Sequence, residues 1–443
     1  MDERNPEPPG EHLSNDEISE FDHQIDDFVP KERSYLHFDP PICEGETPAF
    51  ISDPSQVSSH SFLPFLGFEV RERRFKRENG KTVLKVKTRP IKYASHTDSA
   101  IYEFYSNILS KNYEHELQKR RIQNSILAYR TGIGSNIDHA ANLFAEIENR
   151  QNCICIALDI SGFFDNLRHE IIKKNWCGLL DEKKLPEDHF KVFRSLTRYS
   201  WVTKKELEDR LGRKLRAVKG NRICSIHEFR ERVRQTNPSI IRKNKSGIGI
   251  PQGSSLSGLI ANFYLLDVDT NLIDSLKKIG ASYRRYSDDI AIVAPPGVNP
   301  EIVVEMVSDC LQSVGLSINL TKTEVSVFES TDGLLVADRR FQYLGFTFDG
   351  QKKLVRDSSL NRYFTKMTLA IRAARISAEK KSIPLDRVFL RRHYKTYTHK
   401  GFGRNFVRYA YKAANKMNAP EIRRQLRGHM RIFEAKVRNE FGI

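Results

Sequence analysis

Two runs of apolar residues, each with the length of a β-strand or hairpin, contain aspartates. Residues 152–160 carry apolar side chains on both faces of a strand and contain Asp159 near their end. Residues 282–293 have apolar flanks around a tight turn that holds Asp288 and Asp289. Short runs of this kind, bounded by turn residues, are typical of β-strands. The pattern predicts a strand ending at Asp159 and a hairpin with two adjacent aspartates at its tip.

Helical spacing of apolar residues predicts helices in the segments between and beside these strands. The sequence favours helices within residues 101–109, 137–147, 165–176, 259–266 and 300–314. Alternation predicts further strands within residues 60–95, around a turn at Asn79 and Gly80, and along residues 341–348, followed by a turn at Asp349 and Gly350. Cys153 and Cys155 fit one face of a buried strand better than a metal site.

The composition is that of a globular protein with a basic surplus. Its 443 residues are 39% hydrophobic and 29% charged, which suits two or three domains. The net charge of +16 indicates a polyanionic partner, with solubility alone as the alternative. No run is apolar enough to span a membrane, and no signal peptide is visible. Six cysteines without a CxxC pair favour reduced thiols in a cytoplasm.

Charge is distributed unevenly along the chain. Residues 361–443 contain 21 Lys and Arg against five Asp and Glu, with aromatic residues between them. Such a segment is typical of a nucleic-acid surface, although part of the aromatic set belongs to a helix core. Residues 1–30 are acidic and predict a flexible or loosely docked arm, which would screen a basic groove when nucleic acid is absent. Residues 180–250 are polar and rich in Lys and Arg.

The aspartates carry the candidate chemistry. Like charges repel, so Asp288 and Asp289 at a strand tip need a counter-charge, and a divalent metal supplies one. If the strand that ends at Asp159 pairs beside the hairpin, three carboxylates could hold two hard cations about 4 Å apart. Each feature alone has an ordinary alternative, which is a helix N-cap at Asp159 and a simple turn at Asp288 and Asp289.

Five segments in a fixed order narrow the chemistry further. Residues 158–165, 249–254, 286–289 and 343–346 follow one another along the chain, and Lys322 with Thr323 lies between the last two. They resemble the palm motifs A, B, C and E of reverse transcriptases, and Lys322 lies where motif D places its lysine. The resemblance covers about residues 85–350. It implies an α+β right-hand polymerase fold with fingers, an antiparallel palm sheet of βαββαβ type and a helical thumb.

The resemblance also implies a division of the chain into four segments. Residues 1–35 would form the acidic arm and residues 36–155 part of the fingers. The palm would occupy residues 156–355, with an insertion of the fingers near residues 180–250. A basic, helical thumb that also binds RNA would follow at residues 356–443.

The roles of the metal ligands carry over from the resemblance. Asp159 and Asp288 would bind two Mg²⁺ ions directly, with Mn²⁺ as a substitute, and Asp289 would support them. The backbone carbonyl of Ile160 would also contact a metal. Lys322 would donate a proton to pyrophosphate or neutralise its charge, and a solvated lysine is the alternative.

Residues around the nucleotide carry over in the same way. Phe164 would be the gate that excludes a ribose 2′-hydroxyl, unless it is a core aromatic beside Phe163. Gln252 would contact the incoming nucleotide, and Gly253 would let the backbone approach it closely. Contacts with the triphosphate are expected from the basic residues Arg89, Lys92 and Arg130. Residues Tyr343, Leu344 and Gly345 would form the primer grip, for which an ordinary hairpin is the alternative.

The resemblance points to an RNA-directed DNA polymerase that copies an RNA template into DNA from deoxynucleoside triphosphates. The expected template is a structured non-coding RNA. It favours the bacterial reverse transcriptases of antiphage defence and abortive infection, which are related to retron and group II intron enzymes. Ser287, where retron enzymes usually carry alanine, tilts this assignment away from retrons. The alternatives are template-independent or protein-primed DNA synthesis and msDNA synthesis of the retron type. The expected location is the cytoplasm, without a membrane.

Overall fold

The computed structural model describes residues 28–442 except 44, 46–47, 79–80 and 402–404. Most of the predicted acidic arm and the predicted turn at Asn79 and Gly80 therefore lie outside the described residues. The chain forms two compact units. The first unit comprises Met1–Glu116 and Phe164–Tyr264, and the second comprises Leu117–Phe163 and Leu265–Ile443. The four segments predicted from the sequence are a different division of the chain and stay predictions.

The first unit contains a four-stranded sheet in the order β2-β1-β4-β5. Strands β1 (Phe65–Glu78) and β2 (Lys81–Tyr93) pair antiparallel along their whole length, so the strands predicted within residues 60–95 are confirmed. Strand β4 (Ser200–Thr203) runs parallel to β1, and β5 (Arg242–Lys243) pairs antiparallel with β4. Its core gathers apolar residues that include Leu66, Val202 and Val233.

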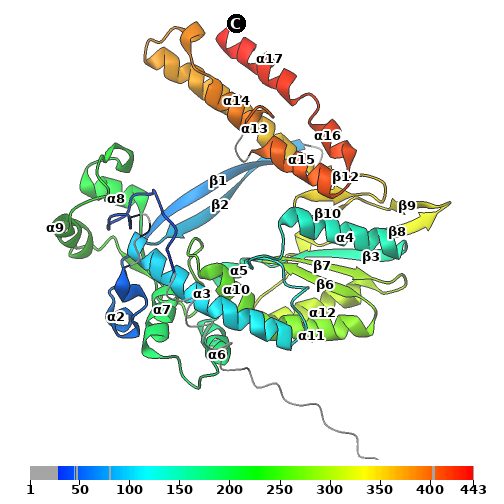
Figure 1. Cartoon of the computed structure of the whole chain (residues 1–443), viewed down its shortest axis with the longest axis horizontal. Coiled ribbons are helices and arrows are strands. Elements are labelled where there is room, and N and C mark those ends of the chain that lie inside the picture. Colours follow the sequence, from blue (N-terminus) through cyan, green and yellow to red (C-terminus); the bar gives the residue numbers. More distant parts are fainter. Residues whose placement is uncertain (1–27, 44, 46–47, 79–80, 402–404, 443) are drawn as a thin grey trace, which may run out of the picture. The chain divides into compact units, whose positions relative to one another are not determined.

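Short helices make up the rest of the first unit (Figure 1). They are η1 (Ala49–Ile51), α2 (Pro54–Ser59), α6 (His169–Leu179), α7 (Glu187–Thr197), α8 (Lys204–Leu211), η2 (Leu215–Ala217), α9 (Ile226–Phe229), η3 (Arg230–Arg234) and α10 (Ser257–Tyr264). Two helices cross between the units, namely α3 (His96–Lys119) and α5 (Phe163–Asn166).

The single helix predicted within residues 165–176 is wrong, because the chain forms α5 and α6 with a break between them. The break lies at Leu167 and Arg168, whose backbone pairs with another segment. Gly249 donates its N–H to the carbonyl of Leu167 at 2.8 Å, and Arg168 forms a β-bridge with Ile248. Apolar spacing could not reveal this pairing, because the partner lies about 80 residues further along the chain.

The second unit contains a five-stranded antiparallel sheet in the order β6-β7-β3-β8-β9. Its strands are β3 (Cys153–Asp159), β6 (Ser282–Tyr286), β7 (Asp289–Ala294), β8 (Glu324–Thr331) and β9 (Leu334–Ala337). Along the chain, β3 leads through helices to β6 and β7, and α12 (Pro300–Ser313) then leads to β8. This order is the βαββαβ arrangement. The predicted α+β class with an antiparallel sheet is therefore confirmed.

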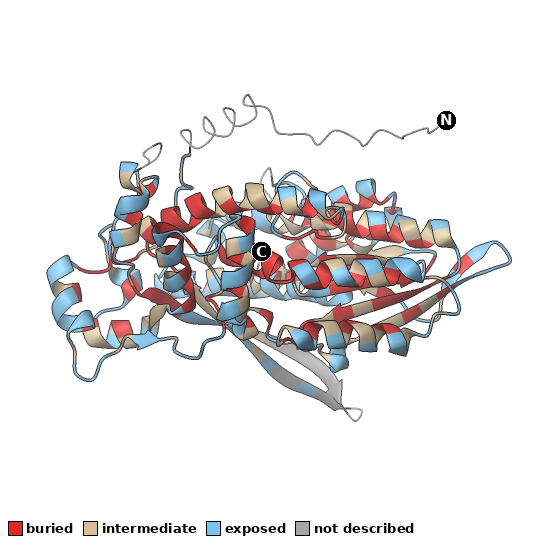
Figure 2. Cartoon of the chain, turned by 90° about the horizontal axis from the view of Figure 1, so that it is seen from below, coloured by how far each residue is buried: buried red, intermediate tan, exposed pale blue. Residues whose placement is uncertain are grey.

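Helix α4 (Asn136–Arg150) packs its apolar stripe into the core of the second unit. Its residues Ile137, Leu143 and Phe144 are buried together with Cys153 and Cys155 of β3. The two cysteines are thus buried on one face of the strand, as the sequence predicts. Buried positions, red in Figure 2, run along the strands and helices of the chain. The remaining helices before β8 are α11 (Leu266–Lys278) and η4 (Leu320–Lys322).

A small three-stranded sheet, β10-β11-β12, follows the large one. The run of residues 341–348, predicted as a single strand, is split into β10 (Phe341–Tyr343) and β11 (Phe346–Phe348), and β12 is Lys353–Val355. The split occurs because Leu344 and Gly345 have φ angles of 45° and 91°. Positive φ at both central residues is the geometry of a two-residue hairpin turn.

Helices form the last part of the second unit, as expected for residues 356–443. They are α13 (Asp357–Lys380), η5 (Leu385–Arg387), α14 (Arg391–Tyr397), α15 (Phe406–Lys416), α16 (Pro420–Gln425) and α17 (His429–Phe441). Their apolar residues share the core of α4 and the sheet. No helix in the described part of the chain is long and apolar enough to cross a membrane.

A fully buried ion pair joins β6 to α11 inside the second unit. The side chains of Arg285 and Asp269 are both 0% exposed. Arg285 donates through Nε and NH2 to the two carboxylate oxygens of Asp269 at 2.8 and 2.6 Å. The hydroxyl of Tyr283 also donates to Asp269, at 2.8 Å. Such a pair offsets the cost of burying its charges only while both partners are present.

Asp269→Asn is expected to lower the free energy of unfolding by about 3–5 kcal/mol, because it leaves the Arg285 charge buried and uncompensated. The matched control is Asp267→Asn, which removes the exposed pair with Arg120 from the same helix and should cost less than about 1 kcal/mol. Urea unfolding followed by circular dichroism compares the two variants. An equal shift of the two unfolding midpoints would contradict the expected difference.

Candidate active site

The strand register places two of the predicted aspartates opposite each other. Asp159 is the last residue of β3 and Asp289 the first of β7, and they are direct partners across the antiparallel ladder. Asp288 precedes β7, and its carbonyl accepts a hydrogen bond from the N–H of Ile160 at 3.0 Å. The three aspartates and Ile160 therefore meet at one end of the sheet, as the pairing of two strand ends requires.

A strained turn presents Asp288 and Asp289. Ser287, between β6 and β7, is buried and has a φ angle of 60°, a conformation that costs a residue other than glycine about 1–2 kcal/mol. Two contacts hold it there. The hydroxyls of Ser287 and Tyr129 are 3.0 Å apart, and Arg285 donates through NH1 to the Ser287 carbonyl at 3.2 Å. Ser287, to which the sequence assigned no chemistry, is thus part of the support of the turn.

Lys322 reaches the same end of the sheet. Its ammonium group forms an ion pair with Oδ1 of Asp159, while 42% of its side chain remains exposed. The preceding backbone is fixed beside β3, because Asn319 donates its N–H to the Asp159 carbonyl at 2.8 Å and Ser161 donates to Ser317 at 2.8 Å. The charge therefore has a defined partner, and the role of Lys322 towards pyrophosphate stays a prediction.

The negative charges of neighbouring aspartates raise the pKa of Asp289. Burial by the surrounding protein and the charges of Asp288 and Asp159 raise the pKa of Asp289 to about 6, against opposing effects of Lys322 and Arg356. Asp289 is nevertheless exposed to solvent. The like charges of its neighbours explain the direction of the shift even for a carboxylate with that exposure.

The donor set is suited to a hard divalent cation, although the side chains do not form a closed metal site. Among the described residues, no group of three His, Cys, Asp or Glu side chains is arranged to hold a metal ion. The ammonium group of Lys322 neutralises the carboxylate of Asp159. Carboxylate oxygens are the ligands that Mg²⁺ prefers, and the raised pKa of Asp289 is a sign of charge that a cation would stabilise.

Phe164 and the Gln252 loop belong to the first unit. Phe163 is buried with 3% exposure, whereas Phe164 is only half-buried. Ile250 donates its N–H to the Phe164 carbonyl at 2.9 Å, and Lys92 donates to the Gln252 carbonyl at 2.9 Å. A Cβ atom on Gly253 would lie 2.6 Å from the Lys92 carbonyl oxygen. The packing of the loop against β2 therefore already requires glycine at this position.

Two of the three predicted triphosphate ligands, Arg89 and Arg130, have partners within the protein. Arg89 on β2 is exposed and forms an ion pair with Glu72 at 3.2 Å. Arg130 donates through NH1 to the backbone carbonyls of Gln123 and Ile126, the latter at 2.6 Å. Arg89 lies in the first unit and Arg130 in the second. The Arg130 side chain thus stabilises the backbone of the preceding loop through these hydrogen bonds.

The predicted primer grip is the β10–β11 turn. Tyr343 is buried, and burial raises the pKa of its hydroxyl. Asn136, at the start of α4, donates through its amide to the Leu344 carbonyl at 3.3 Å and to the Tyr409 hydroxyl at 2.8 Å. The Tyr409 ring stacks on Phe346. The turn is therefore tethered to α4 and α15 within one core.

A protein family model matches the part of the chain that contains most of these site residues. The family model described as "Reverse transcriptase (RNA-dependent DNA polymerase)" matches residues 208–348. Over these residues the chain is similar to reverse transcriptases. The matched residues include Gln252, Asp288, Asp289 and Lys322. They leave out Asp159 and Phe164, which precede the match.

The Retron Se72 reverse transcriptase of Salmonella heidelberg (strain 579083-10) is a curated protein that is similar to part of this chain. It is 35% identical over 79 residues, which are 17% of this chain and 21% of that protein. The chain thus matches only about a fifth of the length of this relative. The expected relation to retron enzymes is confirmed over that stretch.

Solved structures also overlap with the chain. The match with apo telomerase from Candida tropicalis covers 84% of this chain and 58% of the telomerase chain, with 12% sequence identity and a TM-score of 0.40. The match with the RNA-dependent RNA polymerase of a human picorbirnavirus covers 64% of this chain and 43% of the viral chain, with 14% sequence identity and a TM-score of 0.36.

Asp289→Asn is expected to raise the melting temperature in EDTA at about pH 8, because the charged carboxylate is repelled by Asp288 and Asp159. The pKa of Asp289 in the folded state lies above that of an unfolded aspartate. Folding therefore favours the protonated form, and the unsubstituted protein loses this stability as the pH rises through about 6. The gain from the substitution should shrink towards about pH 5.

Melting curves at the two pH values test this expectation, with Asp332→Asn in the exposed β8–β9 turn as the control. A gain that is the same at both pH values would show that charge repulsion is not its cause.

Proposed function

We propose that the protein is an RNA-directed DNA polymerase that works by two-metal nucleotidyl transfer. One observation carries the proposal: Asp159 and Asp289 are paired across β3 and β7, and Lys322 is bound to Asp159. Asp289 and Lys322 lie within the residues that match the reverse-transcriptase family model. Two strand ends that carry carboxylates, with a lysine ammonium group bound to one of them, suit a reaction in which negative charge develops on phosphate. The right-hand arrangement of fingers, palm and thumb is part of the proposal.

The metal ions would be held by Asp159 and Asp288, with Asp289 and the Ile160 carbonyl in support. The chemistry that two bound Mg²⁺ ions, or Mn²⁺ in their place, would supply is activation of a primer 3′-hydroxyl and stabilisation of the departing pyrophosphate. The protein's own contribution is the rigid turn that presents the carboxylates. Lys322 would then neutralise charge on pyrophosphate or donate a proton to it.

The selection of deoxynucleotides would rest on Phe164. Its ring is half-buried beside a fully packed Phe163, so the core alone does not account for it. A bulky ring at the sugar would clash with a 2′-hydroxyl. Gln252 would contact the nucleotide, while Gly253 has the packing role described above. For the triphosphate, Arg89 is the stronger candidate, because its ion pair with Glu72 is exposed and Arg130 is bound to backbone carbonyls.

The primer would lie against the turn of Tyr343, Leu344 and Gly345. The tether from Asn136 and Tyr409 would keep this turn rigid, as positioning of a primer terminus demands.

The proposed template is a structured non-coding RNA and the proposed setting is bacterial antiphage defence in the cytoplasm. The net charge of +16 supports a nucleic-acid partner. The name of the retron relative supports a second candidate, which is synthesis of msDNA as in retrons. Template-independent or protein-primed synthesis in abortive infection remains the other alternative. Sequencing of the nucleic acid that co-purifies with the protein distinguishes the three.

Asp288→Ala is expected to abolish extension of a DNA primer on an RNA template in the presence of Mg²⁺ and deoxynucleotides, because a proposed metal ligand is lost. Asp309→Ala, which removes an exposed carboxylate from α12 of the same unit, should leave extension intact. A gel-based extension assay compares both with the unsubstituted protein. Extension that survives in the Asp288 variant would remove the aspartates from the mechanism.

Phe164→Ala is expected to raise the incorporation of ribonucleotides relative to deoxynucleotides by about tenfold or more, because the ring no longer meets the 2′-hydroxyl. The control is Phe190→Ala, which truncates an exposed ring in the same unit. The ratio of kcat/KM for the two nucleotides is the measurement. If both variants keep the selectivity of the unsubstituted protein, Phe164 is an ordinary packing residue.

A further inference from the structure

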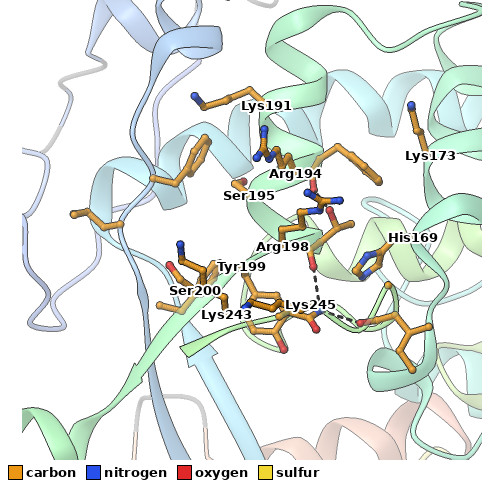
Figure 3. A pocket seen from close by; sticks show the side chains of 18 of the residues that line it. His169, Lys173, Lys191, Arg194, Ser195, Arg198, Tyr199, Ser200, Lys243 and Lys245 are labelled. Atoms are coloured by element: carbon orange, nitrogen blue, oxygen red, sulfur yellow. Dashed lines mark hydrogen bonds between the residues drawn. The ribbon is translucent and has the colours of Figure 1, made fainter. Parts of the chain in front are cut away.

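The first unit contains a large cavity lined by basic side chains. Its volume is about 1430 Å³, and its walls come from α6, α7, β4 and the segment around β5. Figure 3 shows Lys191, Arg194 and Arg198 of the α7 region on one side, Lys243 and Lys245 on another, and Lys173 from α6. Glu170 is the only acidic side chain among the described residues that line it.

The basic side chains of this cavity lack acidic partners. Lys173, Lys191, Arg194, Arg198, Lys243 and Lys245 form no ion pair with a carboxylate in the part of the chain that the structure describes. Other cations of the same unit are paired: Arg213 with Glu228 at 2.7 Å, Arg242 with Glu206 at 2.5 Å and Lys214 with Glu208 at 3.1 Å. Like charges gathered without counter-charges repel one another, so an anion from outside would stabilise them.

Helix α7 separates its two faces by residue type. Val192, Phe193 and Leu196 are buried. Lys191 and Arg194 of α7, and Arg198 directly after its last residue, lie at positions i, i+3 and i+7 and line the cavity. Seven residues of helix span about 10 Å. The three charges are thus spread along a line, which suits consecutive phosphates of a chain better than a single phosphate.

The size and the aromatic content of the cavity favour a polymer. Pockets for small molecules have volumes of roughly 300–1,000 Å³, which this cavity exceeds. The half-buried ring of Tyr199 lines it and lies 5.4 Å from Trp201, so the wall offers a surface for base stacking. Basic grooves with aromatic residues are typical of sites for single-stranded nucleic acid.

We propose that this cavity binds the phosphodiester backbone of a single-stranded nucleic acid over several nucleotides. The choice of nucleic acid as the anion rests on the proposed polymerase function, whereas the anion site itself rests on the unpaired cations.

The cavity wall is also bonded to the segment that leads to Gln252. The His169 ring nitrogen lies 2.8 Å from the carbonyl oxygen of Gly249, and the Asn244 amide donates to the carbonyls of Thr197 and Ile248 at 3.0 and 2.9 Å. A strand bound in the cavity would therefore contact a wall that positions the start of the Gln252 loop. This would link strand binding with the placement of the nucleotide-contacting loop.

The test compares two triple variants of the full chain. The cavity triple is Lys191→Gln, Arg194→Gln and Arg198→Gln. The control triple is Lys183→Gln, Lys205→Gln and Lys219→Gln, which removes the same charge from exposed positions of the same unit that do not line the cavity. Binding of a fluorescent single-stranded oligonucleotide of about twelve nucleotides is measured by anisotropy, in EDTA and without nucleotides, over a range of salt concentrations.

The cavity triple is expected to bind about a hundredfold more weakly at roughly 0.1 M salt, and the slope of log K against log salt should fall by about 2. In the control triple, the affinity and the salt slope should both change much less. RNA and DNA oligonucleotides of the same sequence form two arms. Stronger binding of RNA would assign the site to the template or a partner RNA, and stronger binding of DNA would assign it to the product.

Two results would overturn the proposal. One is equal affinity and slope for the two triples. The other is displacement of the oligonucleotide by inorganic phosphate at similar concentration, which would mark a site for small anions. If the cavity triple unfolds in a thermal melt, Lys243→Gln with Lys245→Gln on the opposite wall takes its place.

The experiment separates this proposal from the polymerase function. Binding needs no catalysis, so Asp288→Ala should bind the oligonucleotide normally even if it never extends a primer. Unchanged binding by the cavity triple would refute the cavity proposal and leave the polymerase function untouched.

Discussion

The buried ion pair between Arg285 and Asp269 is the interaction on which the candidate site depends. Arg285 uses Nε and NH2 for the carboxylate of Asp269 and NH1 for the carbonyl of Ser287. Because neither charge has access to water, the pair tolerates little rearrangement. The β6–β7 turn is therefore held in one conformation, including the positive φ of Ser287. That turn in turn fixes where Asp288 and Asp289 lie relative to Asp159.

This rigidity allows an arrangement that is locally unfavourable. Three aspartates at one sheet end repel one another, and the raised pKa of Asp289 is the direct consequence. Lys322 and Arg356 offset only part of the repulsion. A sequence that placed neutral residues there would fold with less strain, and locally unfavourable groups held by a well-packed frame are typical of functional sites. The three adjacent carboxylates are thus the source both of the repulsion in the folded protein and of the proposed metal binding.

Sequence patterns were sufficient for features that depend on local periodicity. The end of β3 at Asp159, the hairpin around residues 286–289 and the buried face of Cys153 and Cys155 follow from a period of two residues. The split of residues 341–348 did not follow, because Leu344 is not a usual residue at positive φ. The break between α5 and α6 depends on a partner segment far along the chain.

The supports of the site were missed for a related reason. A signal existed for Arg285, because it alternates with Tyr283 on the inward face of a strand and a buried charge requires a partner. The sequence offers Asp267, Asp269 and Asp274 on one helix as partners, and only the packing of α11 against β6 selects Asp269. The role of Tyr129 towards Ser287 carries no local signal at all. Long-range partners of polar groups are set by tertiary packing, not by spacing.

The distribution of charge shows why composition alone identifies a binding surface poorly. Residues 361–443 hold the densest surplus of Lys and Arg, yet several members are already engaged: Arg372 and Arg375 both bind Glu440, at 3.1 and 2.9 Å. Its aromatic rings are partly used as well, since Phe406 stacks on Tyr363 and Tyr409 on Phe346. The cavity of the first unit contains fewer cations, but the six named above have no carboxylate partner among the described residues. Because an unpaired cation attracts an external anion more strongly than a neutralised one does, the pairing of charges, more than their density in the sequence, decides which surface favours nucleic acid.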